Sequence, residues 1–175
     1  SSAASDVYKR QGLKMRTPGL GGEVLTKVGG TVVNMPAGEI FTALQTGAID
    51  ATEWIGPYND QALGLHKAAK YYYTPGWQEP NVTFELDINL KAWETLPADL
   101  QAIVRAAARD VNADMLDDYN AKNMEAMEQL KKEGVDVRRL PDEVLAKLKE
   151  VSAGVVDATA AADPAAQKVL SLIHI

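Results

Sequence analysis

The stretch that decides the fold is LKMRTPGLGGEVLTKVGGTVVNMPAGEIFTALQTGAIDAT, residues 13–52. Its apolar residues alternate between short strand-like runs and helical spacing, and glycine or proline separates the segments. The pattern predicts strands over 13–17, 31–34 and 48–52, and helices over 21–28 and 36–45. Proline in the first turn of the second helix and Gly47 after its end mark its boundaries. Strand, helix, strand, helix, strand in about 40 residues predicts an α/β domain with a parallel sheet.

Two charged residues stand where these strands end. Arg16 closes the first strand and Glu53 follows the third. Open parallel sheets bind ligands just beyond the carboxyl ends of their strands, so both residues are candidates for a binding site. The Arg16 guanidinium could offer two parallel donors to a carboxylate, or it could be a surface group paired with a nearby acid. The residue type alone leaves both interpretations open.

Two turns combine carboxylates with aromatic side chains. The third strand leads into TEWIGPYND, residues 52–60, where Glu53 precedes Trp54, and PGWQEP, residues 75–80, contains Glu79. The two glutamates could form an acid/base pair, supply oxygen ligands to a hard cation, or be solvated loop acids. Trp54 could line a pocket or pack in the core.

The remainder of the chain is dominated by one long helical pattern. Strand-like runs at 70–73 and 82–89 come first, and then apolar residues recur at spacings of three and four from 97 to 133. A helix of that length spans roughly 55 Å, so we expect it to run behind two lobes or to reach a second subunit. A strand over 135–139 and a closing helix from 141 to about 161 complete the prediction.

Composition excludes several classes of function. The net charge of −6 argues against nucleic acid as a partner. The chain has no cysteine, which removes disulfides, thiolate nucleophiles and cysteine metal sites, and its two histidines argue against a zinc site or a histidine-based triad. No apolar run reaches the 18 residues typical of a membrane span.

The two ends of the chain are related to each other in an unusual way. One codon choice for DVYKRQ, residues 6–11, gives DNA whose reverse complement encodes LSLIHI, residues 170–175. Folding gives no reason for this relationship, whereas sequencing adapters ligated to both ends of a library fragment produce it. We therefore expect residues 1–11 and 170–175 to be adapter-derived, and residues 12–169 to be an internal piece of a longer reading frame.

Four blocks, read in order, carry a resemblance to a known family. They are GLKMRTPG, GEIFTALQTGAIDATEWIGPYND, KYYYTPGWQEP and NLKAWETLPADLQAIV. Together they resemble the DctP-like extracytoplasmic solute receptors of tripartite ATP-independent periplasmic (TRAP) transporters, nearest to the branch that binds α-keto acids and related monocarboxylates. GAIDATEWIGPYND and the PGW-x-EP turn are the most specific parts, and the resemblance covers essentially all of residues 12–169.

The resemblance implies a periplasmic-binding-protein-like α/β fold of the Venus-flytrap, type II-like kind, with a long backing helix. It also implies that only the C-terminal half of the two-lobed receptor is present. The expected divisions are the ligand-binding lobe core over 12–80, a crossover strand and turn over 81–96, the long helix over 97–133, and a C-terminal strand and helices over 134–169.

The same resemblance implies roles for individual residues. Arg16 matches an arginine that fixes the substrate carboxylate by a two-pronged salt bridge, and Trp54 matches a residue that lines the ligand. Glu53 and Glu79 match carboxylates that hold a sodium ion, with calcium as the less favoured cation. A 2-oxo acid such as pyruvate would give its carboxylate to Arg16 and, with its keto oxygen, chelate that cation. The cation would also reverse the repulsion between two acids and an anionic ligand.

The resulting expectation is a periplasmic receptor, not an enzyme, that delivers a small carboxylate to the permease subunits of a TRAP transporter. Tyr58 and Asn59 are expected as secondary ligand contacts, and a homodimer contact is expected through the C-terminal helices. Two alternatives stay open. One is an enzyme that uses Glu53 and Glu79 as an acid/base pair on a sugar or acyl substrate, and the other is an interaction module whose long helix dimerises.

Overall fold

The computed structural model describes residues 12–79 and 85–173 of the 175-residue chain. Its elements, in chain order, are β1 (Lys14–Arg16), α2 (Gly19–Lys27), β2 (Thr31–Val33), α3 (Ala37–Thr46), β3 (Ala51–Thr52), α4 (Pro57–Ala62), the 3-10 helix η1 (Leu65–Lys67), β4 (Tyr71–Thr74), α5 (Leu90–Glu94), α6 (Ala98–Lys132), β5 (Asp136–Arg139), α7 (Asp142–Ala162) and α8 (Pro164–Ile173). Among the described residues, no helix combines the length and the apolar character that crossing a membrane requires.

The first three strands form a parallel sheet in the order β2, β1, β3, which confirms the predicted alternation of strands and helices. Arg16 lies in register with Val33 on one side and with Thr52 on the other, so the carboxyl ends of all three strands are level. The third strand is shorter than the predicted 48–52 because the N–H groups of Ala48 and Ile49 donate to the carbonyl of Ala43 and close the end of α3.

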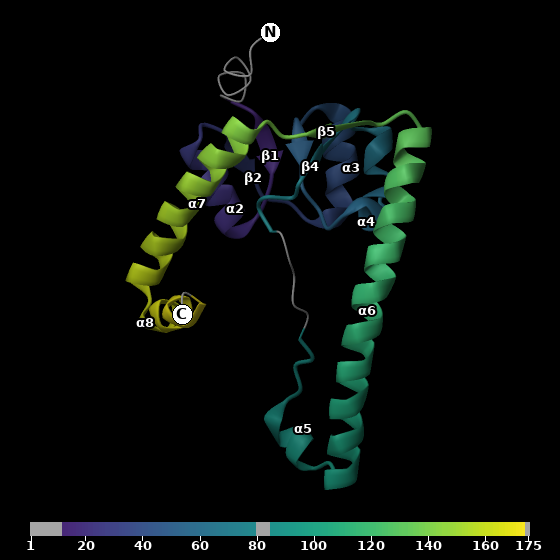
Figure 1. Cartoon of the computed structure of the whole chain (residues 1–175), viewed down its shortest axis with the longest axis vertical. Coiled ribbons are helices and arrows are strands. Elements are labelled where there is room, and N and C mark those ends of the chain that lie inside the picture. The colour runs from purple at the N-terminus through teal and green to yellow at the C-terminus, as the bar shows by residue number, and fades with distance from the viewer. Residues whose placement is uncertain (1–11, 80–84, 174–175) are drawn as a thin grey trace.

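Two small cores hold the helices against this sheet. One core lies under α3 and consists of buried apolar residues, namely Ile40, Ala43, Ile49 and Leu65. The other joins α2 to α7 through Val24, Val144, Leu148 and Val155. Helix α7 therefore returns to the N-terminal lobe and packs beside α2, as Figure 1 shows.

A second sheet forms between segments that are distant in the sequence. β4 pairs in parallel with β5, with Tyr72 opposite Val137. A parallel pair needs a long crossover, and α5 with α6 supplies it. The predicted strand over 82–89 is wrong for residues 85–89, which form no strand, while 82–84 lie outside the described residues. Neither of the two sheets includes 85–89, so their backbone groups have no ladder partner among the described residues.

The long helical pattern folds as one unbroken helix, α6, of 35 residues. It extends from α5 at one end of the molecule to the turn before β5 at the other (Figure 1). Ala126 and Leu130, near its C-terminal end, are buried against the α/β lobe. Ile103 and Val111, nearer its start, are 61% and 62% exposed. Only the C-terminal part of α6 is therefore anchored in a core.

This difference along α6 gives a matched pair of substitutions. Leu130 is 1% exposed and Leu100 is 43% exposed, so the same truncation removes buried contacts at one position only. We expect Leu130→Ala to lower the free energy of unfolding of the chain by about 3 kcal/mol. Leu100→Ala should lower it by less than about 1 kcal/mol. Urea unfolding followed by circular dichroism measures both, and equal losses would contradict the described packing of α6.

Candidate functional site

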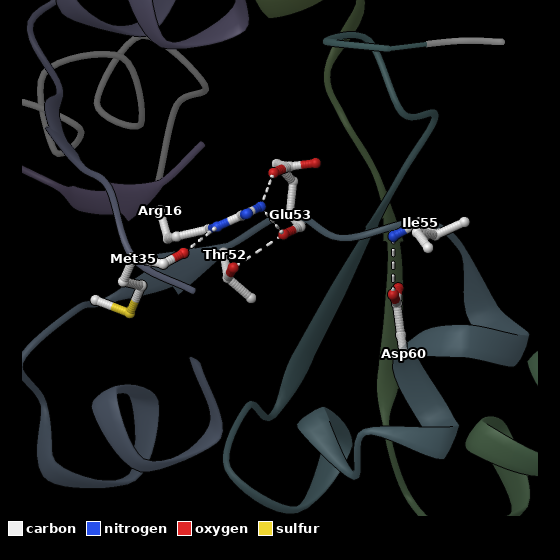
Figure 2. Close-up of polar contacts among 6 residues, drawn as sticks. All are labelled: Arg16, Met35, Thr52, Glu53, Ile55 and Asp60. Carbon is white, nitrogen blue, oxygen red and sulfur yellow. Dashed lines mark hydrogen bonds and ion pairs between the residues drawn. The ribbon is translucent and has the colours of Figure 1, made fainter. Parts of the chain in front are cut away.

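The carboxyl ends of β1 and β3 bring Arg16 and Glu53 into direct contact. Each residue is 9% exposed. The Glu53 N–H donates to the Arg16 carbonyl at 3.2 Å, which continues the parallel ladder by one residue. Arg16 Nη1 donates to Glu53 Oε1 at 2.5 Å, and Arg16 Nε donates to the Met35 carbonyl at 3.4 Å (Figure 2). The sequence predicted both residues at this edge but did not predict that they pair with each other.

The charge balance of this pair favours an added cation. Burial raises the pKa of the Glu53 carboxyl above its ordinary value, the Arg16 guanidinium opposes that rise, and the negative charge of Glu79 adds to it. Glu79 is therefore near enough to act on Glu53, although it is exposed and follows β4. The two predicted cation ligands repel each other, and a positive ion between them would stabilise both carboxylates.

Carboxylate oxygens are suitable donors for sodium or calcium. The described residues hold no group of three or more histidine, cysteine, aspartate or glutamate side chains arranged for a metal. A hard cation held by Glu53 and Glu79 would therefore need further oxygen ligands to complete its coordination. A substrate that carries adjacent oxygens would supply some of them.

Trp54 supports the guanidinium of Arg16. Its ring centroid lies 5.3 Å from Arg16 Cζ, within the range of a cation–π contact. The half-buried side chain also packs against the core cluster that contains Ile40 and Ile49. The pocket-wall and core interpretations are therefore compatible, since one indole ring contacts both the core and Arg16.

The predicted ligand loop is shorter than TEWIGPYND. It comprises residues 53–56, and Pro57 begins α4 with Gly56 as its N-cap, because proline is favoured in the first turn of a helix. Tyr58 faces α6: its N–H donates to Asn123 Oδ1 at 3.0 Å, and its ring meets Tyr119 edge-on at 6.2 Å.

Asn59, the neighbour of Tyr58 in α4, is half-buried. Its Oδ1 is buried and has no hydrogen-bond partner among the described residues. Tyr58 thus joins two helices, and the contacts of neither residue include Arg16. Substrate contact by Tyr58 and Asn59 stays a prediction.

A contact between Asp60 and Tyr72, near the loop, was not predicted from the sequence. Asp60 of α4 accepts hydrogen bonds from the Tyr72 hydroxyl at 2.6 Å and from the Ile55 N–H at 3.3 Å. A signal was present in the sequence, because Pro57 at the start of a helix places Asp60 in its first turn. Side chains in that turn point back toward the preceding loop.

A separate depression of about 230 Å³ lies beside α2, where its lining includes Thr17, Glu23 and Asn34. Neither Arg16 nor Glu53 lines it. The candidate site, formed by Arg16, Glu53 and Trp54 at the carboxyl ends of β1 and β3, is therefore not part of that depression.

Comparison with known proteins gives a family. Residues 7–163 match the family model described as bacterial extracellular solute-binding protein, family 7. The chain is 43% identical over 159 residues to a monocarboxylate 2-oxoacid-binding periplasmic protein of Nostoc sp.. This alignment covers 91% of this chain and 44% of the relative.

Solved structures agree with that match. A TRAP periplasmic solute-binding protein from Colwellia psychrerythraea, with bound calcium and pyruvate, is 39% identical with a TM-score of 0.87, over 94% of this chain and 51% of that one. Another from Pseudoalteromonas atlantica, with bound sodium and pyruvate, is 38% identical with a TM-score of 0.82, over 94% and 50%. The chain therefore has the α/β fold of periplasmic binding proteins and spans about half the length of these relatives.

Proposed function

This chain belongs to family 7 of the bacterial extracellular solute-binding proteins, and on that premise we propose that the protein is a periplasmic receptor for a small carboxylate. The observation that carries the proposal is the buried Arg16 guanidinium at the carboxyl end of β1, beside Glu53 and against Trp54. A fixed arginine with two donors is suited to a carboxylate. The enzyme alternative is set aside, because the family is one of receptors that bind solutes.

The Arg16–Glu53 pair suggests how a ligand would enter. A substrate carboxylate would take the place of Glu53 Oε1 at Arg16 Nη1, where the oxygen now lies at 2.5 Å. Glu53 would then be free to face a cation together with Glu79. Each buried charge keeps a partner before and after binding, so neither is left uncompensated.

The substrate class that fits best is a 2-oxo acid such as pyruvate. Such an acid has one carboxylate for Arg16 and a keto oxygen beside it that can share a hard cation with Glu53 and Glu79. Similar receptors are described with pyruvate and either sodium or calcium. For this protein we propose sodium, with calcium as the competing ion. Delivery to the permease subunits of a TRAP transporter completes the proposed function, and pairing of two copies through the C-terminal helices stays a prediction.

The test is calorimetric titration of the full-length receptor that carries this sequence with pyruvate, in sodium, calcium and potassium buffers. Acetate is the matched control ligand, since it has a carboxylate but no keto oxygen. We expect pyruvate to bind at least tenfold more tightly in sodium than in potassium, and acetate to bind weakly in both. Proton NMR should show pyruvate unchanged after prolonged incubation. Equal affinities for pyruvate and acetate in every buffer would contradict the cation-bridged site.

A further inference from the structure

Residues 53–56, the loop that carries Glu53 and Trp54, are held by α4 as well as by the first sheet. At its start, the Glu53 N–H is bonded to β1. At its middle, the Ile55 N–H donates to Asp60 Oδ1 at 3.3 Å, as Figure 2 shows. The Ile55 side chain itself is 51% exposed, so the loop has little apolar packing there to hold it. Two described hydrogen bonds hold the far half of the loop to α4: the one from Ile55 to the Asp60 side chain, and one from the Asp60 N–H to the Gly56 carbonyl at 2.8 Å.

Asp60 is fixed in turn by Tyr72. The Tyr72 hydroxyl donates to Asp60 Oδ2 at 2.6 Å, and the Ile55 N–H donates to Oδ1, so the two carboxylate oxygens accept from different donors. Along β4 the side chains alternate: Tyr71 and Tyr73 are 50% and 48% exposed, whereas Tyr72 points inward. β4 is paired with β5, so the Asp60–Tyr72 bond connects the loop to the second sheet.

The protonation states suit this arrangement. Burial raises the pKa of Tyr72 well above its ordinary value, and the neighbouring Asp60 charge adds to the rise. The hydroxyl therefore stays protonated and remains a donor at any physiological pH. Burial also raises the pKa of Asp60, while the hydrogen bonds from Tyr72, Ile55 and Gly56 oppose that rise. The Tyr72 hydroxyl and the Ile55 N–H each donate to a different oxygen of this carboxylate, so the three residues form one connected group.

We propose that Asp60, held by Tyr72, is a positioning residue that fixes residues 53–56 so that Glu53 and Trp54 remain in place beside Arg16. The inference rests on the proposed function, since Glu53 and Trp54 matter as parts of a ligand site. The side chain of Asp60 makes its hydrogen bonds to Ile55 and Tyr72 and not to Arg16, Glu53 or Trp54, and its negative charge adds to the rise in the pKa of Glu53. Asp60 keeps the loop ordered before the ligand arrives. Without Asp60, the free energy of ordering the loop has to be supplied by ligand binding, which weakens the affinity.

The first variant is Tyr72→Phe, which removes one hydroxyl and keeps the ring. We expect the dissociation constant for pyruvate in sodium buffer to rise about tenfold, which corresponds to the loss of one hydrogen bond to a charged group. Tyr71→Phe is the matched control, because Tyr71 is on the same strand, is half exposed, and its ring contact with Arg138 survives the change. The control should bind pyruvate as the unchanged receptor does.

Asp60→Asn is the second variant, and it keeps the side chain's shape while weakening both hydrogen bonds. The double variant should bind no more weakly than the weaker single variant, because both substitutions break the same unit. Binding is measured well below the melting temperature, so that a loss of stability alone cannot change the affinity. Unchanged affinity in both variants, with a lowered melting temperature, would reduce the pair to a structural role and overturn the proposal.

A second readout separates this proposal from the proposed function. Hydrogen exchange of the amides of residues 53–56 is measured without ligand in the same proteins. We expect faster exchange at Ile55 in Tyr72→Phe and Asp60→Asn than in Tyr71→Phe. If the unchanged receptor binds no small carboxylate, the proposed function fails while faster exchange still supports the positioning of the loop. Equal exchange in all variants would overturn the positioning itself, whatever the ligand.

Discussion

Arg16→Ala is expected to weaken pyruvate binding by roughly 30-fold to 5,000-fold. Removing one partner of a buried, hydrogen-bonded charge pair costs roughly 2 to 5 kcal/mol in a complex. In the unliganded protein, Arg16 also compensates Glu53, which is only 9% exposed. We expect the free energy of unfolding to fall as well, by about 3 kcal/mol, because Glu53 is left as a buried acid with no cationic partner.

Two further arginine variants make this result specific. Arg16→Lys keeps the charge but not the planar fork, so we expect an intermediate loss of affinity. Arg138→Ala is the control for removing an arginine, because Arg138 is exposed and bonded to Asp136 at the surface. Calorimetric titration at a temperature well below unfolding measures each one. Pyruvate affinity within threefold of the unchanged receptor in Arg16→Ala would remove Arg16 from the site.

Glu53→Gln is expected to weaken pyruvate binding in sodium buffer by about a hundredfold and to make the affinity equal in sodium and potassium. The sign of this effect is informative, because Glu53 has two possible influences on the ligand. As the partner of Arg16 at 2.5 Å it competes with the substrate carboxylate, so neutralising it would raise affinity. As a ligand of the cation it assists the substrate, so neutralising it lowers affinity. We expect the second influence to be the larger.

Glu79→Gln should change affinity in the same direction as Glu53→Gln, and by less, since Glu79 is exposed and better solvated. Glu125→Gln is the control, because Glu125 is an exposed glutamate on α6. The combination Arg16→Ala with Glu53→Gln should unfold less easily than Arg16→Ala alone, since it removes both members of the pair. Tighter pyruvate binding by Glu53→Gln would show that Glu53 is only the resting partner of Arg16.

The spacing of strands and helices in residues 13–52 was enough to predict the first sheet. Parallel strands end at one edge, so Arg16 and Glu53 could be assigned to the same place from sequence alone. Their mutual ion pair could not be, because the rotamers of two long side chains depend on the groups around them. The pairing of β4 with β5 was likewise hidden by the more than 60 residues that separate them.

Two errors have clear physical causes. Proline at position 57 was interpreted as part of a turn, but proline both ends loops and begins helices, and Pro57 does the second. The alternating run at 82–89 has the side chains of a strand, yet strand propensity describes a pleated and half-buried surface, which residues 85–89 lack in this chain. The Asp60–Tyr72 bond was missed because it joins separate elements across η1.

Helix α6 is long and, among the described residues, is held near its C-terminal end only, so a small change in its tilt would move its N-terminal end. Its C-terminal part is clamped to the lobe through α4, where Asn123 and Tyr119 contact Tyr58. At a rise of 1.5 Å per residue, its 35 residues extend about 50 Å. From Asn123 to Ala98 the helix extends about 38 Å, so a tilt of about 5° at these contacts would displace its N-terminal end by roughly 3 Å. Because α4 follows residues 53–56 directly and contacts α6, a small reorientation of that loop that tilts α4 would move the N-terminal end of α6 by a few ångströms.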